Sequence, residues 1–208
     1  MRLKNIFLKI LPLVFFPSLL LPAGLFASQE NTALCDNLVI SQERCERNGI
    51  LISQPTPIDE KIRDIILFND LNRLEDYAAW LKENITYVHD EGGDNWSSAE
   101  QTLKRKKADC EDFAFLNAAV LRVCGYKPQV ISVMRICRSH ALCVFKEGRT
   151  YSIMDNSRLV RTKCESMEEL SRYLFSQYWC QSICALDFAG KNMKILYKNT
   201  QIAKNLTD

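Results

Sequence analysis

The spacing of apolar residues predicts a helical region between residues 58 and 85. Apolar side chains recur there every three or four positions, which is the period of one face of an α-helix. The pair Asn69-Asp70 interrupts this pattern, so we expect one broken helix or two helices packed on a core. The apolar positions are Ile58, Ile62, Ile65, Ile66, Leu71, Leu74, Ala78, Leu81 and Ile85.

Two capping boxes predict further helices. Residues 97–100 have the Ser-x-x-Glu pattern that satisfies unpaired backbone groups at a helix start, and the helix should end in the basic run 104–107. Residues 166–169 repeat the pattern and should open a helix that reaches about Phe175. A last strand is expected at residues 193–197.

A third apolar stripe predicts a helix from Asp109 to Cys124, which Gly125 and Pro128 should end. Asp109 is a favourable N-cap, and this places Cys110 in the first helical turn. Unpaired backbone N–H groups and the helix dipole favour negative charge at that point. They would lower the pKa of a thiol and offer hydrogen-bond donors to an oxyanion.

The carboxylates beside Cys110 oppose this effect. Asp109, Glu111 and Asp112 bring negative charge close to the thiol, and nearby negative charge disfavours a thiolate. We therefore expect a cation to offset them, either an imidazolium or a bound metal ion. In the structural alternative, Asp109 and Asp112 only cap the helix and Glu111 faces solvent.

Three extended stretches predict an antiparallel hairpin whose turn is centred between Glu147 and Gly148, because glycine accepts a positive φ. In such a hairpin the numbers of paired residues add up to 295, and His140 and Asp155 meet this condition. Their β-carbons would lie roughly 5 Å apart, close enough for an imidazole to meet a carboxylate. The stretches are residues 129–138, 140–145 and 150–155.

Cys110, His140 and Asp155 together form the set that nucleophilic cysteine chemistry requires. The thiol needs a base, and the base needs a group that fixes its tautomer. Each residue also has an ordinary interpretation: half of a disulfide, a strand histidine and a turn residue. Asn156 leaves open which side chain orients His140, because asparagine can also do so.

Composition narrows the class of protein. The chain has 208 residues, of which 47% are hydrophobic, so it can bury a core. Its net charge is +2 and its basic residues are scattered, which gives no reason to expect nucleic-acid binding. With two histidines in the chain, any histidine site must use His89 or His140, and we expect His89 in a surface loop.

Residues 1–27 predict an export signal. Basic residues precede an apolar run from Ile10 to Leu21, and Ala27 is a small residue at the expected cleavage position. Prolines interrupt the run, which disfavours a permanent membrane span. Removal of the signal would leave residues 28–208 as one domain, periplasmic or secreted.

Nine cysteines follow the expected signal and would enter an oxidising compartment. An odd number leaves at least one thiol unpaired. We expect up to four disulfides, with the ninth cysteine either a nucleophile or a buried free thiol. Cys137 and Cys143 flank His140 and could pair around it. The cysteine spacing does not match a zinc ribbon.

The stretches 108–125, 139–144 and 153–156 resemble the transglutaminase-like superfamily. Within it, the Asp-Cys-Glu-Asp motif is similar to that of the bacterial transglutaminase-like cysteine proteinases, and the likeness covers roughly residues 69–156. The resemblance implies a papain-like α+β fold. The cysteine helix would pack against an antiparallel sheet that carries the histidine and the aspartate.

By this resemblance Cys110 is the nucleophile, His140 the base and Asp155 the orienting residue. The resemblance also implies calcium bound beside the nucleophile by Asp109 and Glu111. It implies an exported cysteine endopeptidase that cleaves a periplasmic or surface protein, such as an adhesin. Two alternatives remain: protein-glutamine acyl transfer to an amine, or a non-catalytic, disulfide-stapled binding module of the same fold.

Overall fold

A computed structural model describes residues 56–90, 95–136, 138–187 and 192–198 of the chain. The expected signal segment and Cys137 lie outside the described residues. Among the described residues, no helix has the length and apolar character needed to cross a membrane.

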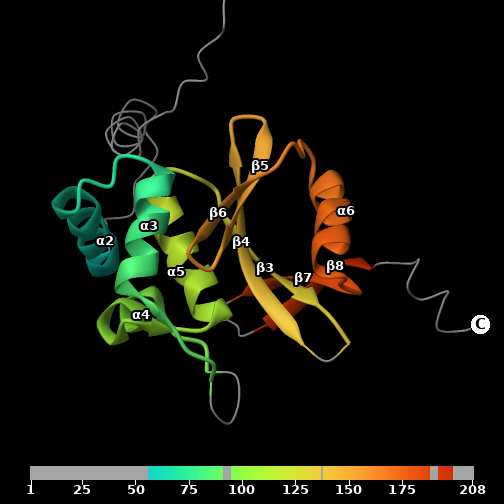
Figure 1. The fold of residues 1–208 in the computed structure, drawn as a ribbon, viewed down its shortest axis with the longest axis horizontal. Coiled ribbons are helices and arrows are strands. Elements are labelled where there is room, and N and C mark those ends of the chain that lie inside the picture. Colours follow the sequence, from blue (N-terminus) through green and yellow to red (C-terminus); the bar gives the residue numbers. More distant parts are fainter. Residues whose placement is uncertain (1–55, 91–94, 137, 188–191, 199–208) are drawn as a thin grey trace, which may run out of the picture. The chain divides into compact units, whose positions relative to one another are not determined.

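Five helices of the described chain surround the sheet (Figure 1). The helical region expected at residues 58–85 consists of two helices, and Asp70 in the connection between them has a positive φ of 51°. The helices are α2 (Pro57–Phe68), α3 (Leu74–Asn84), α4 (Ala99–Arg105), α5 (Cys110–Val123) and α6 (Met167–Tyr178).

The main sheet has six antiparallel strands in the order β6-β5-β4-β3-β7-β8. A separate parallel pair joins β1 to β2 just before α5. The strands are β1 (Thr86–Tyr87), β2 (Lys107–Ala108), β3 (Gln129–Met134), β4 (Ser139–Glu147), β5 (Thr150–Asp155), β6 (Arg158–Arg161), β7 (Ser182–Asp187) and β8 (Asn192–Lys198). The expected α+β class is therefore confirmed.

The two faces of the sheet bury two separate cores. One core joins the sheet to α2–α5, and alternate residues of β4, such as Ala141 and Cys143, point into it. The other core lies under α6, and Leu142 and Val144 point into it. This alternation is the period of two that a strand imposes. Figure 1 shows α5 and α6 on opposite sides of the central strands.

The helix starts follow local capping rules. Asp109 caps α5, and its side chain accepts a hydrogen bond from the Asp112 N–H, as expected. Helix α4 starts one residue later than expected: Ser98 is its N-cap and Gln101 completes the capping box, because Ser97 is engaged elsewhere. Helix α6 is also longer than expected and ends at Tyr178 rather than Phe175.

The hairpin has a different register from the predicted one. Glu147 pairs with Thr150 and Cys143 with Met154, so paired numbers add up to 297 rather than 295. The two-residue turn begins with Gly148, which has a φ of 61°. A shift of two residues keeps every side chain on its expected face, whereas a shift of one would have reversed the faces.

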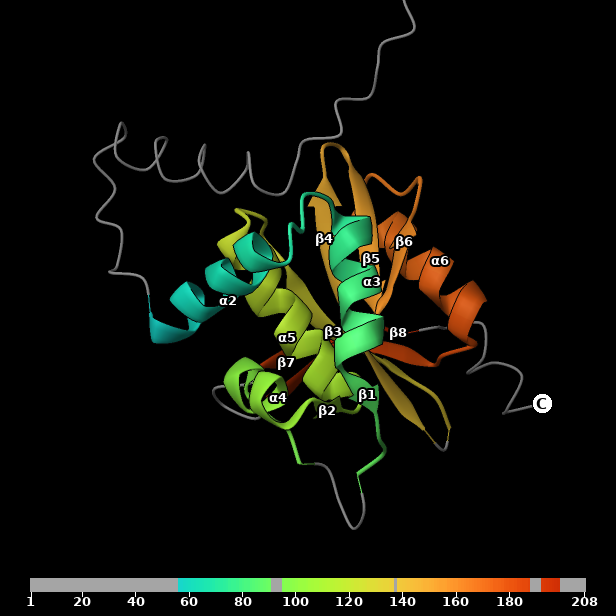
Figure 2. The same ribbon diagram turned by 60° about the vertical axis from the view of Figure 1, so that its left-hand side comes forward.

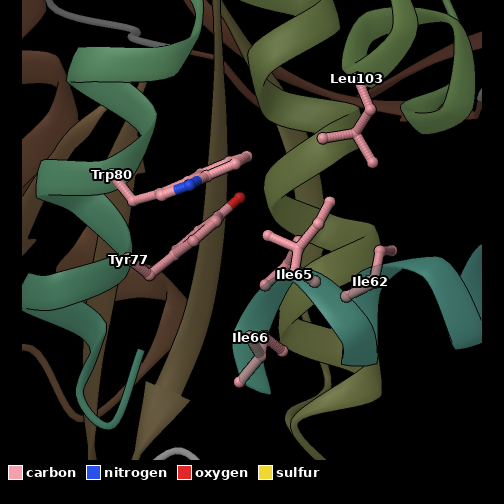
Figure 3. Close-up of a pocket in the computed structure, with 7 residues that line it drawn as sticks. Ile62, Ile65, Ile66, Tyr77, Trp80 and Leu103 are labelled. Atoms are coloured by element: carbon pink, nitrogen blue, oxygen red, sulfur yellow. The ribbon is translucent and has the colours of Figure 1, made fainter. Parts of the chain in front are cut away.

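A small apolar cavity of about 10 Å³ lies between α2, α3, α4 and α5 (Figure 3). The rings of Tyr77 and Trp80 stack there with centroids 6.4 Å apart. Apolar and aromatic side chains line the cavity, and it is smaller than a bound ligand needs. We assign this cavity to helix packing.

Candidate functional site

Cys110 is the first residue of α5 and is buried. Its position follows from Asp109, whose extended backbone and capping side chain begin the helix there. The N–H groups of Asp112 and Phe113 bond to Asp109. Within the described residues, the backbone N–H groups of Cys110 and Glu111 remain for another acceptor.

The thiol of Cys110 is held in its protonated form. Its Sγ donates to Oε2 of Glu111 at 2.9 Å. Burial, this hydrogen bond and the charges of Glu111 and Asp109 raise the pKa of Cys110 to about 12, and a hydrogen bond from the backbone of Ala141 acts in the opposite direction. Burial, followed by the neighbouring carboxylates, therefore disfavours the thiolate in this arrangement.

The two carboxylates beside Cys110 are buried as well. Asp109 and Glu111 each expose less than a tenth of their surface. Burial raises the pKa of Asp109 to about 6, and the charges of Glu111, Asp112 and Asp90 add to this increase. Glu111 is thus not solvated, contrary to the structural alternative. Negative charge is thus concentrated in a buried place. Among the described residues, no cationic side chain pairs with Asp109.

His140 and Asp155 form the second part of the site. His140 is the second residue of β4, and Asp155 is the last residue of β5. Nε2 of His140 lies 2.7 Å from Oδ1 of Asp155. The contact is diagonal across the strands, because the register places Asp155 two positions from the direct partner of His140. Diagonal neighbours on one face are within reach of long side chains.

The carboxylate of Asp155 is stabilised in its charged form. Burial would raise its pKa, but hydrogen bonds from His140 and Arg158, the charge of His140 and a hydrogen bond from Tyr178 together lower it to about 2. An ionised carboxylate only accepts hydrogen bonds, so Nε2 of His140 must carry the proton. Nδ1 is then the basic nitrogen, and within the described residues it has no hydrogen-bond partner.

Two partners of Asp155 were not expected from the sequence. Arg158 donates to Oδ2 at 2.6 Å, and the hydroxyl of Tyr178 donates to the same oxygen at 2.9 Å. The Tyr178 ring also stacks on His140, with centroids 5.9 Å apart and an angle of 28°. Arg158 lies three residues after Asp155, across a two-residue turn, so local spacing could have suggested it. Tyr178 lies on another element and gives no such signal.

In this structure, the Cys110 part of the site and the His140–Asp155 part are connected only through backbone contacts. The thiol of Cys110 lies beside the backbone of Ala141, the residue after His140, and α5 packs on β4. Among the described residues no hydrogen bond links Cys110 to His140, because the thiol proton goes to Glu111. Catalytic hydrogen bonds often form only once a substrate binds.

A buried chain of hydrogen bonds also connects α5 to the end of β5. The hydroxyl of Tyr77 donates to Oδ1 of Asn117, and Nδ2 of Asn117 donates to the carbonyl of Asn156, both at 2.9 Å. The side-chain oxygen of Asn156 is buried, and no partner for it is found in the described residues. Asp155 rather than Asn156 therefore contacts His140.

Two aromatic residues and His89 lie on or near the segment that leads to the motif. Tyr87 stacks on Phe113 of α5, and burial raises the pKa of Tyr87. Trp96 packs on Phe115 with ring centroids 5.4 Å apart, so it belongs to the core. His89 is exposed, as expected, and lies 3.4 Å from the Tyr87 hydroxyl.

The cysteine pattern differs from the expected one. Cys110, Cys143, Cys164 and Cys184 are free thiols. These four leave five of the nine cysteines, so at most two disulfides can form instead of four. Cys143 is fully buried in β4 and does not pair with Cys137 around His140.

Comparison with known protein families finds a match for the middle of the chain. Residues 67–148 match the transglutaminase-like superfamily. This segment contains the Asp-Cys-Glu-Asp motif and His140, and it ends before Asp155. The resemblance seen in the sequence is thus confirmed, and this segment is a transglutaminase-like core.

Several solved structures share features of the fold. A candidate cysteine protease from Cytophaga hutchinsonii is 19% identical with a TM-score of 0.41, and the match covers 53% of this chain and 44% of that one. Calcium-bound LapG from Legionella pneumophila is 12% identical with a TM-score of 0.45, covering 79% and 98%. EGTA-treated LapG is 15% identical with a TM-score of 0.38, covering 64% and 76%. TM-scores below 0.5 mark these likenesses as distant, and no curated protein matches the chain.

Proposed function

We propose that the protein is a cysteine peptidase in which Cys110 is the nucleophile, His140 the base and Asp155 the orienting residue. The observation that carries this proposal is the 2.7 Å contact between Nε2 of His140 and Asp155, on the strand against which the Cys110 helix packs. Acyl transfer requires a histidine held in one tautomer and a thiol that it can deprotonate, and the residue after His140 contacts the helix-terminal thiol of Cys110 through its backbone.

The first step forms an acyl-enzyme. Nδ1 of His140 takes the proton of Cys110, and Sγ attacks the carbonyl carbon of the substrate. The negative charge on the carbonyl oxygen is stabilised by the backbone N–H groups of Cys110 and Glu111 at the start of α5. When the C–N bond breaks, Nδ1 returns the proton to the leaving amine and a thioester remains.

The second step releases the acyl group. Nδ1 of His140 removes a proton from a water molecule, whose oxygen attacks the thioester carbon, and the thiol leaves with that proton. Asp155 keeps Nε2 protonated throughout and stabilises the imidazolium that forms in each half-reaction. An amine in place of water would give crosslinking instead of hydrolysis by the same groups.

We also propose calcium as a bound ion on the Cys110 side, with Asp109 and Glu111 among its ligands. Two buried carboxylates with hard oxygens suit calcium, and their crowding needs a positive charge. They are an incomplete set, since calcium takes about six to eight oxygens, and the described residues contain no group of three or more candidate ligands. Bound there, the ion would offset the carboxylates and favour the thiolate of Cys110.

The proposed setting is the periplasm or the exterior of the cell, with a protein as substrate. It depends on the export signal expected at residues 1–27 and on the cysteine-rich chain that follows. A periplasmic or surface protein, such as an adhesin, fits an endopeptidase of this kind. Secretion of the intact chain, followed by sequencing of its mature N-terminus, tests the expected cleavage after Ala27.

The test of the enzyme proposal is alkylation of the native protein with iodoacetamide, read by mass spectrometry. Cys164 is an ideal internal control, because it is a free thiol that is less buried than Cys110. With calcium, Cys110 should react at least about tenfold faster than Cys164, since an activated thiolate outweighs exposure. With EGTA, Cys110 should react more slowly than Cys164. A His140→Gln variant should lose the calcium-dependent advantage.

A low concentration of a peptidyl electrophile should block the labelling of Cys110 and leave Cys164 unaffected. Labelling of Cys110 at the same rate in the native protein and in His140→Gln would contradict the proposed base. Cys110 recovered in a disulfide would contradict the proposed nucleophile.

A further inference from the structure

The carboxylate of Asp155 forms hydrogen bonds with residues of three different elements. Its Oδ1 meets His140 of β4, and its Oδ2 accepts from Arg158 of β6 and Tyr178 of α6. Helix α6 covers the face of the sheet opposite α5, as Figures 1 and 2 show. The proposed orienting residue is therefore fixed by an element that belongs to the other core of the domain.

Tyr178 is the residue that touches both members of the pair. Its hydroxyl donates to Asp155 at 2.9 Å, and its ring stacks on His140 at 5.9 Å. Burial and the charge of Asp155 raise the pKa of Tyr178, so its hydroxyl stays protonated and remains a donor. One side chain thus restrains the carboxylate and the plane of the imidazole together.

The position of Tyr178 is itself well determined. It is the last residue of α6, and Leu170 and Leu174 anchor that helix with no exposed surface. The next residue, Trp179, ends the helix with a left-handed backbone at φ 51°. The chain then returns at once to the buried Cys180. The end of the helix cannot move without disturbing the core beneath it.

Arg158 makes a weaker restraint, although its hydrogen bond is shorter. Its side chain is 69% exposed, whereas that of Asp155 is 12% exposed. Water competes for an exposed guanidinium and salt screens it, so such pairs contribute little. Arg158 also has no ring contact with His140. Arg158 also bonds to Tyr178 itself, so the two donors are compared by changing each of them in turn.

We propose that Tyr178 is a positioning residue, which holds Asp155 and the ring of His140 so that Nε2–H points at the carboxylate and Nδ1 is left for Cys110. This inference rests on the proposed function for its catalytic meaning, whereas its structural content concerns His140 alone. The residues around Tyr178 form no recognisable motif, so its role could not be predicted from the sequence.

The experiment combines two readouts on Tyr178→Phe and Tyr178→Leu. Phenylalanine keeps the ring and loses the hydrogen bond, whereas leucine loses both. Tyr173→Phe is the matched control, because Tyr173 lies on the same helix and its hydroxyl has no hydrogen bond within the described residues. Arg158→Gln removes the other donor to Oδ2.

The first readout is NMR of protein labelled with ¹⁵N-histidine. The chain has two histidines, so the exposed His89 serves as an internal reference for His140. In Tyr178→Phe the ring nitrogens of His140 should shift toward a mixture of tautomers, and those of His89 should not change. Tyr173→Phe should leave both histidines as they are.

The second readout is the burst of nitrophenolate that follows mixing with p-nitrophenyl acetate, which measures acylation of Cys110. Tyr178→Phe should slow the burst about tenfold, as expected for losing a hydrogen bond to a charged group. The way in which the burst rate depends on the ester concentration should be the same as in the native protein. Tyr178→Leu should slow the burst further, and Arg158→Gln should slow it less than about threefold.

Unchanged His140 resonances in Tyr178→Phe, with Tyr173→Phe as reference, would overturn the inference even if Tyr178→Leu does not fold. Absence of any burst in the native protein would instead overturn the proposed function. In that case the NMR readout alone still decides whether Tyr178 positions His140.

Discussion

The Cys110 side and the His140 side of the site hold their charges in opposite ways. Around Asp155, donors from three elements lower the pKa to about 2 and stabilise the charge that orients His140. Around Cys110, burial and neighbouring carboxylates raise the pKa to about 12 and oppose the charge that would attack a substrate. The proposed base already has its orienting partner in this structure, whereas the proposed nucleophile is a thiol that donates a hydrogen bond to Glu111.

This difference shows where activation must act. The His140 side needs no further partner, because both oxygens of Asp155 accept hydrogen bonds. The Cys110 side needs positive charge or a new hydrogen-bond partner that draws Glu111 away from the thiol. A substrate or a bound cation would therefore change the Cys110 side first.

The largest effect is expected from removing the nucleophile. Cys110→Ser keeps a donor to Glu111 but replaces the thiol with a hydroxyl, a far weaker nucleophile at neutral pH. The nitrophenolate burst should fall by about 10⁴-fold or more, as for other nucleophile deletions. Cys164→Ser, a change at a free thiol away from α5, should leave the burst unchanged. A burst that survives in Cys110→Ser would place the nucleophile elsewhere.

Asp155→Asn should have the next largest effect, because it reverses the hydrogen bonding of His140. Arg158 and Tyr178 both donate to the Oδ2 position, so the amide oxygen must lie there and the NH₂ group must face Nε2. Nε2 then becomes an acceptor, the proton moves to Nδ1, and the base is lost. The burst should slow by up to about 10⁴-fold, as for a wrong tautomer in a triad.

The control for this prediction uses the same two donors. Adding Tyr178→Phe and Arg158→Met to Asp155→Asn frees the amide to turn its oxygen toward Nε2. Part of the lost rate should return in the triple variant. No return would mean that charge, rather than the tautomer, is what Asp155 supplies.

The sequence predicted the Cys110 side more directly than the His140 side. The N-cap at Asp109 and the apolar stripe of α5 are local features, and they placed Cys110 in the first turn correctly. Burial of Glu111 was beyond local reasoning, because it depends on how β1, β2 and α4 cover the helix start. The direct contact of Glu111 with the thiol was missed for the same reason.

The hairpin shows how a wrong register can still bring the right residues together. We placed the turn one residue too early, which shifted the pairing by two positions. An even shift preserves the face, so His140 and Asp155 remain neighbours, on a diagonal. Tyr178 and the second core under α6 could not be foreseen, because they depend on contacts distant in sequence. The free thiols at Cys110, Cys143, Cys164 and Cys184 could not be foreseen either, because compartment alone does not determine which thiols lie within reach of each other.

Acid should lower the stability of the folded protein by protonating Asp155. The pKa of this carboxyl is lowered to about 2 in the folded protein, from an ordinary value of 3.8. Its contribution to the free energy of unfolding, about 2 kcal/mol, is therefore fully present above the unfolded pKa and is lost as pH falls toward about 2. Urea unfolding should show the native protein and Asp155→Asn converging in stability between about pH 5 and pH 2.5. A constant difference would mean that Asp155 is not held as a carboxylate.

Tyr77→Phe should have the smallest effect, and it probes the link between the two sides. The hydroxyl of Tyr77 donates to Asn117, which in turn holds the backbone beside Asp155. Its removal leaves a buried amide oxygen unpaired, which should cost about 1–2 kcal/mol of unfolding free energy. The burst should change less than about twofold, because His140 and Asp155 keep their own partners. Tyr173→Phe gives the baseline for losing an unbonded hydroxyl. A large loss of burst with little loss of stability would mean that the two sides are aligned through Asn117 rather than through α6.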